Sequence, residues 1–171
     1  MAEEKTEEIF KNEEQQNRKK ERLIKILEDV TQKMQKVVNE TPEAPPEEKI
    51  LSVDKMSLNI LSKRFQSGKF SFWGGLVNSS AFPDLHHLEC DVPTIKNIII
   101  PEKSRKQDYG SKIVKVWEES FREKGFFAFA ITNVKYHDET VMKFWQKQGY
   151  VIPESEKRKS QPYYMMKVIK S

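Results

Sequence analysis

The fold is decided by the stretch Ile98-Ile-Ile-Pro-Glu-Lys-Ser-Arg-Lys-Gln-Asp-Tyr-Gly-Ser-Lys112. An apolar strand stops at a proline, a polar loop with a glycine follows, and a helix then begins. Strand, loop and helix N-terminus together offer unpaired backbone N–H groups and the positive end of a helix dipole. The stretch therefore predicts a site that holds an anion such as a phosphate.

Two apolar strands are predicted on either side of this loop and its helix, over residues 94–100 and 126–131. Their apolar residues suit burial on both faces, so we expect the strand 94–100 to be central in a sheet. A helix is predicted over residues 111–124, with Gly125 as its left-handed stop. A strand, helix, strand unit of this length predicts two parallel neighbours.

The remaining segments of the second part of the chain predict further strands and helices. The predicted strands cover residues 49–53, 70–77, 86–91, 150–152 and 163–169, the last two forming a terminal hairpin. Gly74 and Gly75 indicate a bulge or bend, and residues 78–84 a turn. One helix is predicted from Asp54 or Ser57 to Gln66, and another from its N-cap Asp138 to its stop at Gly149.

Residues 1–40 predict a charged helix that precedes this domain. Apolar residues recur at spacings of four and three over about two heptads: Leu23, Leu27, Val30, Met34 and Val37. The interpretations are a helix that dimerises or docks a partner through residues 20–40, or an amphipathic helix folded onto its own domain or partly frayed. Three prolines in residues 41–49 predict a linker, which leaves 50–171 as the globular domain.

The composition limits the classes of protein to which this chain can belong. The 171 residues, 37% of them hydrophobic, suit one globular domain with some extra chain. Residues 1–48 carry a net charge of −4, which leaves +8 for residues 49–171. Because the lysines and arginines are spread along the chain rather than gathered in one block, we expect a solvated basic surface and no nucleic-acid partner.

The cysteine and histidine residues and the length of the apolar runs predict the cellular setting, metal binding and membrane contact of the protein. A lone Cys90 excludes an intramolecular disulfide framework, so we expect a reducing, intracellular or cytoplasmic setting. His86, His87 and His137 lack companions at metal-ligand spacing, so no metal is expected. No run approaches the ~18 apolar residues of a membrane span, so we expect a soluble protein without membrane contact.

Two local motifs resemble a known family. The loop from Arg105 to Gly110 looks like the Gln/Arg-x-x-Gly-x-Gly/Ala loop of the GCN5-related N-acetyltransferases. The segment from Asp138 to Tyr150 resembles the closing helix of that family, with an aromatic pair, three residues, then glycine and an aromatic. The resemblance spans residues 49–171 and implies an α/β (α+β) fold: a mixed, mostly antiparallel central sheet flanked by helices, here preceded by the charged helix.

The resemblance also implies a coenzyme site. Acetyl-CoA would be the co-substrate, with its pantetheine paired to the strand backbone and its pyrophosphate on the loop amides, where the basic side chains add positive charge. The residues implied in coenzyme binding are Ile98, Ile99, Ile100, Arg105, Lys106, Gln107, Asp108, Tyr109, Gly110, Ser111, Lys112, Asp138, Phe144 and Trp145.

Three residues depart from the family pattern. Asp108 stands where a glycine is usual, and its carboxylate would repel a pyrophosphate unless it points away or pairs with a lysine. Ser104 adds one residue to the loop. Trp145 stands where the family usually keeps a tyrosine that protonates the leaving thiolate, and an indole cannot act as an acid near neutral pH.

Other residues would then supply the acid and the base. Tyr109, Tyr136 or a water are candidates for the acid, while the Trp145 N–H could still donate a hydrogen bond toward the sulfur. Candidates for the base are Glu89, His87 and Glu102, with Glu89 foremost. Tyr163 and Tyr164 begin the last strand, which in this fold borders the acceptor side, although packing is the commoner role of such residues.

The resemblance implies transfer of an acetyl group from acetyl-CoA to an amine by direct attack. The acceptor would be an amine-bearing protein or small molecule. The alternative, favoured by Asp108, Trp145 and the heptad pattern, is a degenerate, non-catalytic module of the same fold that binds or scaffolds a protein partner.

Overall fold

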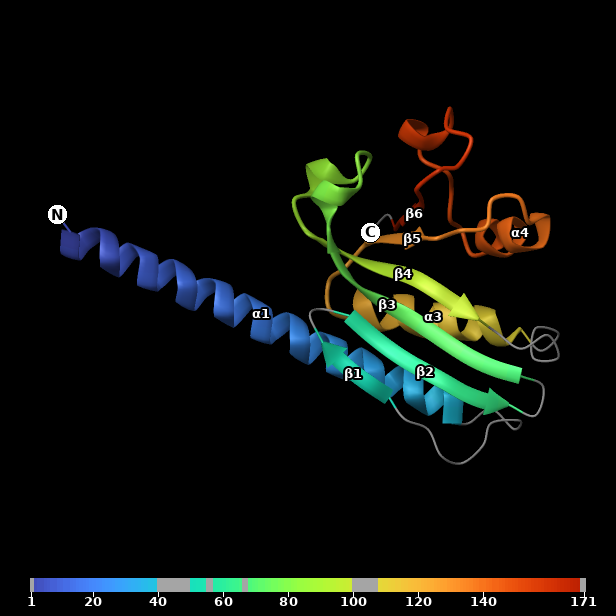
Figure 1. Cartoon of the computed structure of the whole chain (residues 1–171), viewed down its shortest axis with the longest axis horizontal. Helices are drawn as coiled ribbons and strands as arrows, with labels where there is room; N and C mark the ends of the chain where they lie inside the picture. Colours follow the sequence, from blue (N-terminus) through green and yellow to red (C-terminus); the bar gives the residue numbers. More distant parts are fainter. Residues whose placement is uncertain (1, 40–49, 55–56, 66–67, 100–107, 170–171) are drawn as a thin grey trace.

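The computed structural model describes residues 2–39, 50–54, 57–65, 68–99 and 108–169. Its elements in chain order are α1 (Ala2–Asn39), β1 (Ile50–Asp54), β2 (Ser57–Phe65), β3 (Gly68–Asn78), η1 (Ser79–Ala81), η2 (His86–Leu88), β4 (Asp91–Ile99), α3 (Tyr109–Arg122), β5 (Ala128–Thr132), α4 (Glu139–Lys147), η3 (Glu154–Glu156) and β6 (Tyr164–Val168). The expected fold class is confirmed: a mixed, mostly antiparallel sheet with helices, preceded by a long charged helix (Figure 1).

The six strands lie in one sheet in their sequence order, and all neighbours are antiparallel except the β4–β5 pair, which is parallel. β4 is therefore central, as its sequence predicts. The predicted terminal hairpin is also present, since Val151 and Met166 exchange two backbone hydrogen bonds of 2.9 Å.

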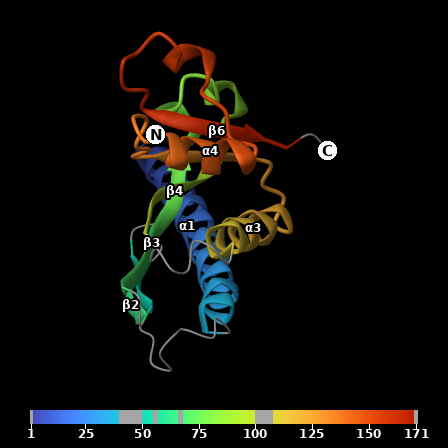
Figure 2. The same cartoon turned by 90° about the vertical axis from the view of Figure 1, so that its right-hand side faces the viewer.

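Alternation along the strands divides the buried side chains between the two faces of the sheet. In β5, Phe129 and Ile131 enter the main hydrophobic cluster, whereas Ala128 and Ala130 enter a second cluster with Phe82. Figure 2 shows α1 and α3 side by side on one face of the sheet. The main cluster thus joins the sheet to α1, α3 and α4.

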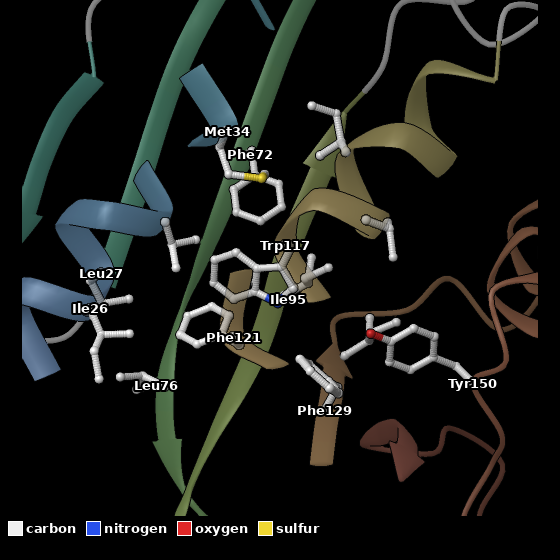
Figure 3. Packing of buried hydrophobic residues seen from close by; sticks show 14 of the residues in the cluster. Ile26, Leu27, Met34, Phe72, Leu76, Ile95, Trp117, Phe121, Phe129 and Tyr150 are labelled. Carbon is white, nitrogen blue, oxygen red and sulfur yellow. The ribbon is translucent and has the colours of Figure 1, made fainter. Parts of the chain in front are cut away.

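Trp117 of α3 lies at the centre of the main cluster (Figure 3). Its ring packs against Phe72 of β3 at 5.1 Å and against Phe121, one turn further along α3, at 4.7 Å. Met34 and Leu27 reach the same cluster from α1. Burial of these large apolar side chains holds α1, α3 and the sheet together.

The heptad residues of α1 pack on the protein's own domain. Leu23 and its three successors Leu27, Val30 and Met34 are at most 8% exposed within the main cluster, while the side chain of Val37 lies outside the described part. Of the two interpretations of this pattern, the structure shows the amphipathic helix folded onto its own domain.

The helix predicted from Asp54 or Ser57 to Gln66 is wrong, because Ser57–Phe65 is the strand β2. Its residues pair with β3 from Ser57↔Gly75 to Phe65↔Gly68. Of the Ser67-Gly68 pair, interpreted as the stop of this helix, Gly68 is the first residue of β3 and Ser67 lies outside the described residues. Backbone pairing with β1 on one side and with β3 on the other makes this segment a strand.

The strand predicted over residues 86–91 is also wrong. Residues 86–88 form the 3-10 helix η2, and Glu89 has a left-handed backbone with φ of 47°. Ser79 and Cys90 close this excursion: the Ser79 N–H donates to the Cys90 carbonyl at 2.8 Å, and the Cys90 N–H to Ser79 Oγ at 3.1 Å. The chain between β3 and β4 is therefore a closed loop, and β4 starts only at Asp91.

Candidate functional site

β4 contains a β-bulge in its middle. Trp73 of β3 pairs with Asn97 of β4, but the next residue, Gly74, pairs with Ile95, so Lys96 is an extra residue on β4. The bulged residue is left out of the regular ladder, and such irregularities are frequent next to functional sites. The glycines at 74 and 75 do mark an irregularity, as predicted, but the inserted residue belongs to the opposite strand.

The pairing between β4 and β5 ends beside this bulge. The parallel register comprises Thr94↔Ala130 and Ile95↔Ile131, whereas β4 continues to Ile99. From Lys96 onward, no residue of β5 lies in register with β4 in the described chain, so this edge of β4 offers backbone N–H and C=O groups to another extended chain.

One side chain bridges the two strands where they part. Asn133 follows β5 with a left-handed φ of 58°, and its Nδ2 donates to the carbonyl oxygen of Lys96 at 3.1 Å. The Lys96 ammonium lies 5.0 Å above the centre of the Trp73 ring, a cation–π contact. The bulge is thus held from both neighbouring strands.

Partly buried apolar side chains surround this part of the sheet. Those packed against the main cluster come from the free end of β4, from the loop after β5 and from α4: Ile98, Val134, Tyr136, Val141, Met142 and Phe144. They are partly buried against the main cluster, and such apolar side chains suit contact with an extended, largely apolar chain.

The N-terminus of α3 lies at the same end of β4. Asp108, the residue before α3, has a left-handed φ of 54°, an exposed side chain and no capping hydrogen bond to the helix. An aspartate therefore adopts left-handed backbone at this position. Gly110 is buried, Lys112 is exposed, and Ser111 Oγ accepts a hydrogen bond of 2.8 Å from Nε2 of Gln148.

An open groove of about 430 Å³ runs along α3 from this N-terminus. Five basic and three acidic side chains line it, together with Ser111 and Gln148: Lys112, Lys115, Arg122, Lys147, Lys167, Asp108, Glu118 and Glu119. The excess of cations and the N–H groups of the first helical turn favour an anionic group at this end.

The predicted coenzyme residues fall into three groups. Ile98 and Ile99 lie in the part of β4 beyond the bulge, Asp108 precedes α3, the first turn of α3 contains Gly110, Ser111 and Lys112, and Phe144 packs against the main cluster. Asp138 caps α4, accepting from the N–H groups of Thr140 and Val141 at 3.0 and 3.2 Å. Ile100, Arg105, Lys106 and Gln107 lie outside the described residues, as does the side chain of Tyr109.

Glu89, the foremost candidate for the base, lies at the opposite end of β4 from the bulge. It precedes Asp91, the first residue of the strand, whereas the bulge and the free edge lie toward Ile99. Asp91 and Ile99 are separated by about 26 Å of strand at ~3.3 Å per residue. His87 is on the same side of the strand as Glu89, in η2, and Glu102 lies outside the described residues.

Trp145 is a core residue. It is 4% exposed, and its ring packs edge-on against Phe144 at 4.8 Å and against Tyr150 at 5.6 Å. Tyr164 is likewise buried, packing on Phe82 at 4.8 Å and donating its hydroxyl to Asp84 at 2.7 Å, whereas Tyr163 is 56% exposed. Packing is therefore the observed role of Trp145 and Tyr164.

Tyr136 carries a buried hydroxyl with no hydrogen-bond partner among the described residues. It belongs to the loop after β5 that also holds Asn133, at the end of the sheet where β4 and β5 part. Burial, and secondarily the charge of Glu156, raises the pKa of Tyr136 to about 12. The phenol is therefore protonated at neutral pH and has a hydrogen bond left to donate.

Sequence reasoning missed Lys96 and Asn133. Lys96-Asn97 interrupts the apolar run of β4, and this pair of polar residues was the available signal for a bulge. Asn133 directly follows an apolar strand, and asparagine is among the few non-glycine residues that adopt positive φ readily. Neither signal reveals that the two residues are hydrogen-bonded.

Comparisons with known proteins give structural similarity only. No family model and no curated protein matches the sequence. Among solved structures, Ard1 from Thermoplasma volcanium is 14% identical, with 70% of this chain and 74% of that chain covered and a TM-score of 0.43. GCN5 from Tetrahymena is 9% identical (85% and 88% covered, TM-score 0.44), and nourseothricin acetyltransferase is 14% identical (71% of each chain covered, TM-score 0.44).

The predicted likeness to acetyltransferases is confirmed as a likeness of structure. With TM-scores below 0.5, it carries no argument about the activity of this chain. Within the described residues, no three histidine, cysteine or carboxylate side chains are grouped as metal ligands, and no helix there has the length and apolar character needed to cross a bilayer.

Proposed function

We propose that the protein transfers an acetyl group from acetyl-CoA to an amine. The observation that carries the proposal is the bulge at Lys96 directly beside the end of the β4–β5 pairing. Together they leave the β5-facing edge of β4 without a strand partner over Asn97–Ile99 in the described chain, while the Lys96 carbonyl is bonded to Asn133.

The residues present fit the coenzyme. The free N–H and C=O groups of β4 would pair with the amides of the pantetheine arm, over the apolar side chains of Ile98 and Phe144. The N-terminal N–H groups of α3 and the side chain of Lys112 would hold the pyrophosphate. Asp108 is exposed and makes no cap, so its carboxylate is able to point away from the phosphates.

Acetyl-CoA supplies an activated thioester. The amine nitrogen forms a bond to the carbonyl carbon, the carbon–sulfur bond breaks, the thiolate leaves and the amine releases a proton to water. The bulge would aim a backbone N–H at the carbonyl oxygen as negative charge develops there. Asn133 would hold this geometry through the Lys96 carbonyl, so we regard it as a positioning residue.

Tyr136 is our candidate for the group that stabilises the leaving thiolate. A thiol has a pKa of about 8.5, so a phenol with a pKa of about 12 would not pass its proton fully to the thiolate. It would donate a hydrogen bond to the developing negative charge. This role replaces the general acid that Trp145 cannot supply.

The test is release of free coenzyme thiol from acetyl-CoA with a panel of amines: peptides with free N-termini, lysine peptides and polyamines. Tyr136→Phe should lower kcat about 100-fold for the amine that is turned over. It should not destabilise the fold, because the lost hydroxyl is buried without a partner in the described structure. Tyr163→Phe, on an exposed tyrosine, is the matched control and should leave kcat unchanged.

The non-catalytic module is the second candidate, favoured by the buried packing of Trp145. Absence of thiol release with every amine, together with absence of acetyl-CoA binding, would decide for it. Equal loss of kcat in the two tyrosine variants would remove Tyr136 from the proposal without touching the coenzyme site.

A further inference from the structure

The first half of α1 extends away from the domain (Figure 1). Every residue from 2 to 22 is exposed, including two large apolar ones: Ile9 is 60% and Phe10 64% exposed. This half, residues 2–22, is called the arm below. At ~1.5 Å per residue it is about 30 Å long. An isolated helix of this length and composition is marginal in water, so a partner that buries Ile9 and Phe10 would stabilise it.

Charge along α1 is divided into two blocks. Residues 3–14 contain six glutamates and two lysines, whereas residues 18–25 contain five basic side chains and one glutamate. Gln15, Gln16 and Asn17 separate the blocks. Two such helices that run antiparallel place each acidic block along a basic one, whereas parallel helices oppose like charges.

A groove of about 300 Å³ lies in the corner where the arm leaves the domain. Lys19 and Arg22 line it from α1, and Phe126 and Phe127 from the chain before β5. Phe127 is 44% exposed. The groove therefore combines an apolar floor with two cations from the basic block.

We propose that this corner binds the arm of a second copy of the chain, giving a two-fold symmetric dimer of antiparallel arms. With the axis near Gln15, the acidic block of one arm lies along the basic block of the other, and Ile9 and Phe10 reach the groove of the partner. The same contact is made twice, as two-fold symmetry requires. Glu89 and Asp91 on the far wall of the groove match the lysines that the acidic block also contains.

This dimer differs from a coiled coil through residues 20–40, because Leu27, Val30 and Met34 are already buried in the main cluster of their own domain. It uses only the exposed arm and the corner groove. The groove lies near the start of β4, whereas the candidate coenzyme site is at the other end of that strand. The dimer proposal therefore does not depend on the proposed function.

The test is sedimentation velocity of the full chain over a range of concentrations at low and high salt. The wild type should dimerise at low salt and dissociate at high salt. Glu13→Lys with Glu14→Lys, and separately Lys19→Glu with Lys20→Glu, should each weaken dimerisation at least ten-fold, and an equimolar mixture of the two variants should form a heterodimer. Lys143→Glu with Arg158→Glu changes the net charge as much as the lysine variant and should still dimerise.

Disulfide trapping reports the direction of the helices. In a Cys90→Ser background, Gln15→Cys should cross-link to its own copy under mild oxidation, because it lies near the axis. Glu3→Cys should not, since in antiparallel arms the two residues are about 36 Å apart. A wild type that stays monomeric at all concentrations, a dimer insensitive to both reversals, or efficient cross-linking through Glu3→Cys would each overturn the proposal.

Discussion

Gly74 sets how closely β3, β4 and α3 approach one another beside the bulge. A Cβ built on this residue would lie 2.8 Å from Cη2 of Trp117, 3.0 Å from Cε1 of Phe72 and 3.1 Å from the carbonyl oxygen of Thr94. Contacts this short are not tolerated without movement of the indole or of the strand. The packing at the centre of the core and at the candidate site therefore requires glycine at position 74.

Gly74→Ala should destabilise the fold by about 1–3 kcal/mol through overpacking against Trp117. Trp117→Phe removes the atom in closest contact, so in that background the same change should cost at least ~1 kcal/mol less. Urea denaturation of the wild type, both single variants and the double variant measures this coupling. Additive effects in this cycle would show that the indole does not limit the space at Gly74.

Single residues with a strong local preference could be predicted from the sequence. Gly125 and Gly149 have positive φ at the ends of their helices, and Asp138 caps α4, all as expected. The role of Lys96 could not be predicted, because a bulge depends on how two strands pair and not on the residue itself. Tyr136 was named as a candidate acid, but its unpartnered hydroxyl became evident only in the folded chain.

At the scale of elements, α1 has two parts with different surroundings. Its second half buries Leu27, Val30 and Met34 against the domain, whereas its first half is exposed. A heptad pattern predicts one apolar stripe on a helix but does not state whether that stripe meets another chain or the same one. The expected division into residues 1–40, 41–49 and 50–171 stays a prediction, although the contacts of α1 cross it.

Leu27→Ala should destabilise the domain by about 2–5 kcal/mol, because the side chain is fully buried in the main cluster. Glu28→Ala, on the exposed side of the same turn, should change the free energy of unfolding by less than about 0.5 kcal/mol. Urea unfolding at a concentration where the chain is monomeric compares the two. If Leu27→Ala leaves the free energy of unfolding unchanged, the heptad residues of α1 would serve association with another chain and not packing in their own domain.

The elements that failed prediction are those that long-range pairing decides. Ser57–Phe65 has residues that suit either a helix or a strand, and pairing with β3 makes it a strand. Residues 86–91 carry alternating apolar side chains, yet the Ser79–Cys90 hydrogen bonds close them into a loop. By contrast, β4, α3, β5 and α4 were predicted to within a few residues because their apolar runs, caps and glycine stops agree with one another.

At the scale of the whole molecule, β4 separates two regions of different character. Its C-terminal half, beyond the bulge, faces the N-terminus of α3, and we assign acetyl-CoA to this end. Its N-terminal end meets the corner groove below the arm, which we assign to a second copy. Association and coenzyme binding would then occupy opposite ends of one central strand.

The most direct test of the account is a calorimetric titration of the full chain with acetyl-CoA. Micromolar binding is predicted for the wild type, at least ten-fold weaker binding for Lys112→Glu in the first turn of α3, and unchanged binding for the matched charge reversal Arg158→Glu. No heat of binding at millimolar coenzyme, or equal weakening by the two reversals, would contradict a coenzyme site at the N-terminus of α3.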